Sequence, residues 1–131
     1  SMDTDKYRST SVPIDVTVTS DRETVASRGE YTPAGDGFVL TFSIGDGKYE
    51  ITHGESDTVL SVGGLLSYTI SFAAAGAVTV ASLFGDIELE VEPISRRVER
   101  NGDTIVVSLC YALTIGGTRT ERDVTVTARA I

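Results

Sequence analysis

The chain has 131 residues, of which 40% are hydrophobic, and it carries a formal net charge of −8. This length corresponds to one domain with room for a sizeable core. The negative charge repels phosphate backbones and argues against nucleic-acid and anionic-membrane partners. We expect residues 1–10, which start with Ser1 as a cloning remnant before Met2, to be a flexible tail, and residues 11–131 to form a single domain.

Short segments of alternating polar and apolar residues follow one another along the chain, separated by turns rich in glycine and aspartate. Such alternation is typical of half-buried strands. Strands are predicted, in chain order, at 11–19, 23–32, 38–44, 48–52, 58–62, 66–73, 77–83, 86–92, from a break or bulge at Pro93 to about 100, 104–115 and 118–130. The best helix candidate, 73–81, contains Gly76 and β-branched valines, which favour a strand there as well.

The last third of the chain predicts a hairpin with a defined register. A tight turn at Gly116-Gly117, where both residues are free to adopt positive φ, places Ile115 opposite Thr118. Counting outward gives one mostly apolar set of pairs: Leu113 with Thr120, Tyr111 with Arg122, Leu109 with Val124, Val107 with Val126, and Ile105 with Ala128. The interleaved set is mostly polar. A slip of one residue would turn one strand's apolar set towards water, so the register is well determined.

The number and spacing of these strands predict an all-β fold, either an antiparallel sandwich or a closed barrel. Sequential hairpins with few long connections favour an antiparallel up-and-down β-barrel of about 8–10 strands, because closure removes exposed sheet edges. A barrel of this size either packs its interior or keeps one ligand cavity.

Five short segments carry a family resemblance. They are Arg28-Gly29-Glu30-Tyr31, Phe38-Val39-Leu40-Thr41-Phe42, Leu83-Phe84-Gly85-Asp86-Ile87-Glu88-Leu89, Gly102-Asp103-Thr104-Ile105, and Tyr111-Ala112-Leu113-Thr114-Ile115-Gly116-Gly117. In this order they resemble the YwiB-like family of bacterial proteins, a domain of unknown function, over nearly the whole chain from about Val12. That family is similar in fold to the calycins, the lipocalin-like β-barrels, so the resemblance implies such a barrel and no established activity. The chain has no Trp, so a lipocalin's ligand is not implied.

The string His53-Gly54-Glu55-Ser56-Asp57 is the densest local group of side chains that can bind a metal. An extended segment would place its imidazole and two carboxylates on one side, but the string does not complete a coordination shell and is also ordinary turn chemistry. It lacks the second glycine of a nucleophile elbow, so Ser56 and His53 do not predict a hydrolase. We therefore predict no metal, no cofactor and no catalytic residue.

The single cysteine and the single basic cluster have structural explanations. Cys110 cannot form an internal disulfide, which suits a reducing cytoplasm. It faces Asp123 in the predicted hairpin, so we expect a structural thiol with a raised pKa. The cluster Arg96, Arg97 and Arg100 is interpreted as a solvated strand or the guarded edge of a sheet.

The candidate ligand site consists of polar groups expected at the barrel interior or rim: Glu30 or Tyr31, Tyr68, Tyr111 and Arg122. An inward Arg122 beside Tyr111 would hold a carboxylate or phosphate through its fixed donor fork. In the alternative, Arg122 pairs with Glu30 or Glu121 at the barrel end, with its stem packed on Tyr111.

Two function classes stay open. One is a non-catalytic module that binds a small, anionic or amphipathic ligand inside the barrel. The other is a protein-interaction or structural domain with a filled barrel, as a homodimer through an edge or the Leu65-Leu66 region. A cavity of roughly 300–1,000 Å³ favours the first class, and a packed interior with an exposed apolar patch favours the second.

Overall fold

Ten β-strands form in the order that the alternating pattern predicts. The computed structural model describes residues 10–64, 67–73, 76–82 and 85–131. The strands are β1 Val12–Ser20, β2 Glu23–Ala34, β3 Gly37–Ile44, β4 Gly47–His53, β5 Thr58–Gly63, β6 Tyr68–Ser71, β7 Gly76–Ser82, β8 Gly85–Asn101, β9 Thr104–Ile115 and β10 Thr118–Ala130. Most of the expected N-terminal tail, and the Leu65-Leu66 segment, lie outside the described residues.

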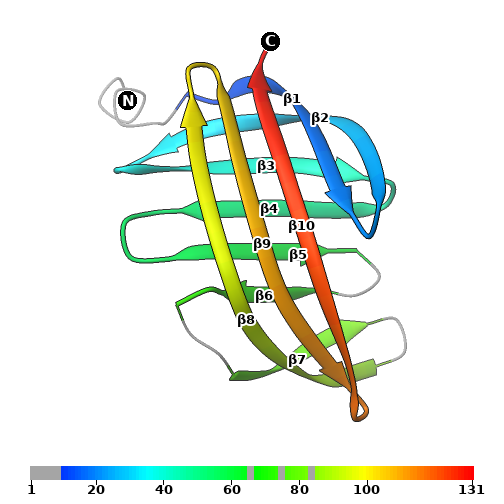
Figure 1. Cartoon of the computed structure of the whole chain (residues 1–131). Helices are drawn as coiled ribbons and strands as arrows, with labels where there is room; N and C mark the ends of the chain where they lie inside the picture. Colours follow the sequence, from blue (N-terminus) through cyan, green and yellow to red (C-terminus); the bar gives the residue numbers. More distant parts are fainter. Residues whose placement is uncertain (1–9, 65–66, 74–75, 83–84) are drawn as a thin grey trace, which may run out of the picture.

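All ten strands belong to one antiparallel sheet in the order β6-β5-β4-β3-β2-β1-β10-β9-β8-β7. Consecutive strands pair with each other except β6 and β7, which form the two edges of the sheet, and β1 pairs in addition with β10, which joins the two halves of the chain. The sheet curls so that β8, β9 and β10 cross over β3, β4 and β5, and the edge strands β6 and β7 approach each other (Figure 1). The prediction of an all-β, antiparallel up-and-down barrel is confirmed, in the form of a nearly closed barrel.

The β9–β10 hairpin has the register that the sequence predicts. Ile115 lies opposite Thr118, and the pairing continues through Tyr111 with Arg122 to Ile105 with Ala128. Gly116 and Gly117 have φ of 57° and 83°, as a tight turn between twisted strands requires. The turn residues Gly116 and Gly117 thus set which β10 side chains face the core.

Strand β8 contains the irregularity expected at Pro93. Its register against β9 shifts between Pro93 and Ser95, and the strand then continues to Asn101. Strand β7 pairs only with residues 85–91 of β8, so the second half of β8 is joined to the sheet on the β9 side alone. A bulge of this kind bends the strand and raises its twist, and here it precedes an open sheet edge.

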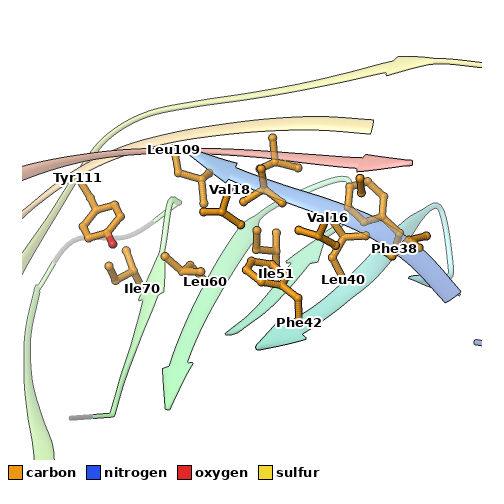
Figure 2. Close-up of a cluster of buried hydrophobic side chains, with 14 of the residues drawn as sticks. Val16, Val18, Phe38, Leu40, Phe42, Ile51, Leu60, Ile70, Leu109 and Tyr111 are labelled. Carbon is orange, nitrogen blue, oxygen red and sulfur yellow. The ribbon is translucent and has the colours of Figure 1, made fainter. Parts of the chain in front are cut away.

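The inner face of the barrel is filled across its middle by aliphatic side chains. The labelled part of this layer consists of Val16, Val18, Leu40, Ile51, Leu60, Ile70 and Leu109, all buried (Figure 2). Tyr111 and Phe38 mark opposite ends of the layer (Figure 2). The middle of the barrel is packed, and the described residues enclose a cavity at each of its two ends.

Candidate functional site

The end of the barrel that contains Tyr111 holds a cavity of about 270 Å³. Its walls come from the β1–β2 and β3–β4 hairpins, the start of β6, and the middle of β5, β9 and β10. Most of the lining is aliphatic or aromatic, and its polar side chains are Ser20, Asp21, Glu23, Tyr49, Tyr68, Tyr111 and Arg122. We call this space the tyrosine cavity.

Tyr111 and Arg122 lie directly opposite each other across the β9–β10 ladder. Paired residues of an antiparallel sheet point to the same face, and the buried neighbours Leu109 and Leu113 identify that face as the barrel interior. Burial, and then the neighbouring Tyr68, raise the pKa of Tyr111 far above its usual range, while Arg122 acts in the opposite direction. Tyr111 is therefore a neutral hydroxyl at every physiological pH.

Aromatic contacts fix the walls of the tyrosine cavity. Phe42 of β3 stacks on Tyr49 of β4, with ring centroids 5.4 Å apart and the planes nearly parallel. Phe72, just after β6, meets Tyr111 edge-on at 6.2 Å. Both arrangements are favourable geometries for aromatic pairs, and the second holds the ring of Tyr111 against Phe72.

Arg122 is half-buried, and in the described ranges it makes no ion pair within 4 Å. The predicted alternative partner Glu121 contacts Arg119 instead, at 3.5 Å. The exposed carboxylates of Asp21 and Glu23 also line the cavity, without forming an ion pair with Arg122. The guanidinium charge is thus not neutralised by a carboxylate of the described residues.

The fold places the five predicted site residues in three different locations. Tyr68, Tyr111 and Arg122 lie together at the tyrosine cavity. Tyr31 lies at the other barrel end, where its ring stacks on Phe38 at 5.8 Å and lines a second cavity of about 280 Å³. The assignment of Glu30 to the interior or rim is wrong: alternation along β2 turns inward the residues that share a face with Tyr31, so Glu30 is exposed on the outer surface.

A solved structure has a fold similar to that of this chain, although no family is assigned to the chain. No family model matches the chain, and no curated protein matches its sequence. The structure is similar to the crystal structure of the ywiB protein from Bacillus subtilis, with a TM-score of 0.76 and 17% identity over 97% of this chain and 98% of that chain. At this identity the likeness shows the fold alone, and it supports the YwiB-like resemblance at that level. Within the described ranges, no helix is long and apolar enough to cross a membrane.

The His53–Asp57 string forms the turn between β4 and β5. The Asp57 carboxylate accepts hydrogen bonds from the backbone of Thr58 at 2.7 Å, the backbone of Ala73 at 2.9 Å, and the Ser71 hydroxyl. Burial alone would raise the pKa of Asp57, but these three hydrogen bonds outweigh it and lower that pKa. Among the described residues, no three His, Cys, Asp or Glu side chains are grouped so that they could hold a metal ion. The carboxylate of Asp57 therefore stabilises the turn between β4 and β5.

Cys110 lies opposite Asp123, on the outer face of the β9–β10 hairpin. The facing Asp123 carboxylate, which accepts a hydrogen bond from the thiol, and then partial burial raise the pKa of Cys110 to about 11. The thiolate is the nucleophilic form, so this cysteine is unreactive at neutral pH.

Sequence reasoning missed the direction in which two arginines point. Arg96 and Arg100 pair with Leu109 and Ile105, so they project from the inner face of β8, and Arg97 projects outward, to Glu99 at 2.6 Å; all three are exposed at the open edge of β8, as expected of a solvated edge strand. The turn Asn101-Gly102-Asp103 could have indicated the direction of these arginines. Extending the hairpin register across that turn places both arginines opposite apolar residues of β9.

Proposed function

We propose that this protein is a non-catalytic, calycin-like barrel of the YwiB-like family that binds a small, singly charged anion in the tyrosine cavity. The supporting observation is the half-buried Arg122 guanidinium, which meets Tyr68 and Tyr111 at an otherwise largely apolar cavity and has no carboxylate partner among the described residues. Removing a charge from water is costly unless it is paired. An anionic ligand would supply that partner.

The shape and charges of the cavity restrict the ligand. A volume of about 270 Å³ is near the lower end of the ~300–1,000 Å³ typical of ligand pockets, so the ligand is small. The aromatic walls suit a short apolar or aromatic body, and Arg122 with the Tyr68 hydroxyl suits a carboxylate or a phosphate oxygen. The exposed Asp21 and Glu23 disfavour polyanions. A short-chain or aromatic carboxylate fits these conditions best.

The remaining parts of the proposal follow from composition. The net charge of −8 argues against nucleic-acid and anionic-membrane partners, and the lone Cys110 suits a cytoplasmic location. The alternative, an interaction domain or homodimer, has weaker support: among the residues whose exposure the structure describes, the exposed large apolar side chains are Val12, Val25, Ile94 and Ile115 on four different strands, and Ile131 after β10.

Native mass spectrometry of the purified protein, repeated after denaturation, tests this proposal. We expect a non-covalent mass that is lost on denaturation and is retained by Arg119→Ala. Arg119 lies on the same strand, and its ion pairs are with the exposed Glu92 and Glu121, so it is the matched control. Arg122→Ala should lose the retained mass, and equal retention by both variants would exclude the proposed role of Arg122.

Octanoate and benzoate extend the test to protein that carries no retained ligand. We expect saturable binding of at least one of them by isothermal titration calorimetry, weakened roughly tenfold by Arg122→Ala, which corresponds to about 1.4 kcal/mol. Absence of saturable binding to both probes would contradict the proposal, and a dimer mass would instead favour the homodimer.

A further inference from the structure

A second group of polar side chains, which includes two arginines, lies at the opposite end of the barrel from Arg122. It consists of Arg96 and Arg100 of β8 together with His53 at the end of β4 and Thr58 at the start of β5, and we call it the arginine cluster. Strand β8 crosses over β3, β4 and β5 (Figure 1), and its inward arginines reach those strands. Arg96 Nη1 donates to Thr58 Oγ1 at 2.9 Å, and the guanidinium of Arg100 lies over the Phe38 ring, 5.0 Å from its centroid.

The hydrogen bonds of Thr58 define how His53 is oriented. Thr58 is fully buried, and its Oγ1 lies 2.9 Å from His53 Nδ1 as well as from Arg96. A guanidinium can only donate, so the hydroxyl accepts from Arg96, and in the tautomer of His53 that is protonated on Nε2 it donates its single proton to Nδ1. In that tautomer the Nε2–H remains as a donor. Its ring is held 5.2 Å from the Phe38 ring, centroid to centroid.

The guanidinium groups of Arg96 and Arg100 and the Nε2–H of His53 are three donors without an anionic partner among the described residues. Neither Arg96 nor Arg100 makes an ion pair within 4 Å with any residue in the described ranges. The charge of Arg96 helps to lower the pKa of Asp57, but the oxygens of this carboxylate already accept three hydrogen bonds from other groups. Asp103 borders the cavity beside Arg100, where its carboxylate accepts from the Thr104 hydroxyl.

The cavity next to Arg100 offers room for an organic group. It has a volume of about 280 Å³ and is lined mainly by apolar residues of β1, β9 and β10 and by the Tyr31 ring. The Arg100 guanidinium lies within cation–π range of Phe38, and its N–H groups, which form no ion pair with the described residues, suit a bidentate acceptor. An oxyanion near Arg96 and His53 could thus be continuous with an apolar group beside Tyr31.

We propose that the arginine cluster is a second ligand site, which binds the phosphate of a small phosphate monoester between Arg96, Arg100 and His53, with its organic group in the cavity beside Tyr31. Two guanidinium groups and one imidazole N–H match the charge and the several acceptor oxygens of a phosphate better than the single charge of a carboxylate. This site is separate from the tyrosine cavity, because the packed middle layer lies between them.

The single histidine of the chain provides a direct readout. Partial burial, then Arg96 and Arg100, lower the pKa of His53. A bound dianion opposes the effect of both arginines, so it must raise that pKa. We would follow the His53 ring resonances by NMR from pH 5 to 8 with sulfate, a dianion throughout this range, and with chloride at matched ionic strength. Sulfate should raise the pKa by roughly one unit relative to chloride, and equal effects of the two salts would overturn the proposal.

Variants and a second probe locate the site. Phenyl phosphate at pH 7.5 should shift the His53 resonances saturably, and Arg100→Gln should weaken this binding about tenfold, the factor expected for the loss of about 1.4 kcal/mol. Arg97→Gln, which removes an outward arginine on the same strand, and Arg122→Ala should leave it unchanged. Equal binding by Arg100→Gln and Arg97→Gln would overturn the assignment, without bearing on the tyrosine cavity.

Two further comparisons test the details. Arg96→Gln should also weaken phenyl phosphate binding. This substitution removes a hydrogen bond to the buried Thr58 as well, so if the variant unfolds, the result for Arg100→Gln decides. Phenyl phosphate should bind more tightly than inorganic phosphate, and Tyr31→Ala should remove that advantage. Equal affinity for the two phosphates would overturn the placement of the organic group beside Tyr31.

Discussion

Gly37 and His53 lie so close in the β3–β4 ladder that a Cβ on Gly37 would overlap the carbonyl oxygen of His53. The obstacle is backbone, which cannot rotate away as a flexible side chain can. Only glycine therefore allows β3 and β4 to pair at this end of the barrel, beside the imidazole of the arginine cluster.

Replacing Gly37 by Ala is expected to destabilise the protein by about 3 kcal/mol, the upper end of the range for overpacking. Gly54→Ala is the matched control, because the nearest atom to its added Cβ is 4.0 Å away and its backbone N–H still donates to Asp57. Urea unfolding of both variants measures the difference. Equal midpoints would contradict the close approach of Gly37 to His53.

The packed middle layer predicts a large cost for truncating Leu40. Its side chain is fully buried between the two halves of the barrel, so Leu40→Ala should cost about 2–5 kcal/mol. Ile94, at the bulge of β8, is 44% exposed, and Ile94→Ala should change the free energy of unfolding by no more than about 0.5 kcal/mol. Thermal or chemical unfolding distinguishes these values, and a similar loss for both would argue against a filled middle layer.

Asp57 is expected to stabilise the turns on both sides of β5–β6. Asp57→Ala removes the acceptor of three hydrogen bonds and should lower the free energy of unfolding by about 1–3 kcal/mol. Glu55→Ala, an exposed carboxylate of the same turn, should have little effect. If Asp57 were instead reserved for a ligand, its removal would leave stability unchanged or improved.

The surroundings of His53 predict a pH dependence of stability. Partial burial, Arg96 and Arg100 hold the pKa of folded His53 below its ordinary value of 6.5. As the pH falls through 6.5, the unfolded chain takes up this proton before the folded protein does, so stability is lost. His53→Asn keeps an acceptor for Thr58 and removes the titration, so the difference in unfolding free energy between the two proteins should decrease from pH 7.5 to pH 5. A constant difference would contradict the lowered pKa.

The Cys110–Asp123 pair predicts that the thiol of Cys110 is alkylated slowly. With a pKa of about 11, Cys110 should react with iodoacetamide at pH 8 roughly a hundredfold more slowly than an ordinary thiol, since each pKa unit changes the thiolate fraction about tenfold. Asp123→Asn should raise the rate roughly tenfold. Asp15→Asn, on a strand that does not adjoin β9, is the control. Equal rates for both variants would show that Asp123 does not control the thiol.

Much of the local structure could be predicted from the sequence, because alternation and turn residues are local signals. The Gly116-Gly117 turn set the β9–β10 register, and that register was sufficient to place Tyr111 beside Arg122 on the inner face. The orientation of strand β2 was harder to predict, because Ser27 and Gly29 interrupt the apolar residues on its inward face. The choice between Glu30 and Tyr31 as the inward residue was settled by pairing with β1 and β3.

The tertiary structure decided which residues meet across the barrel. Arg96 and Thr58 are 38 positions apart in the chain and lie on strands that are not neighbours in the sheet. Their contact depends on how far the sheet twists and curls before its edges approach, which is a property of all ten strands together. The sequence by itself determined the strands, the register of the last hairpin and the inward direction of Arg122. Closure of the sheet decided that the middle is filled, that Tyr31 and Arg122 belong to opposite ends, and that His53 lies beside two arginines.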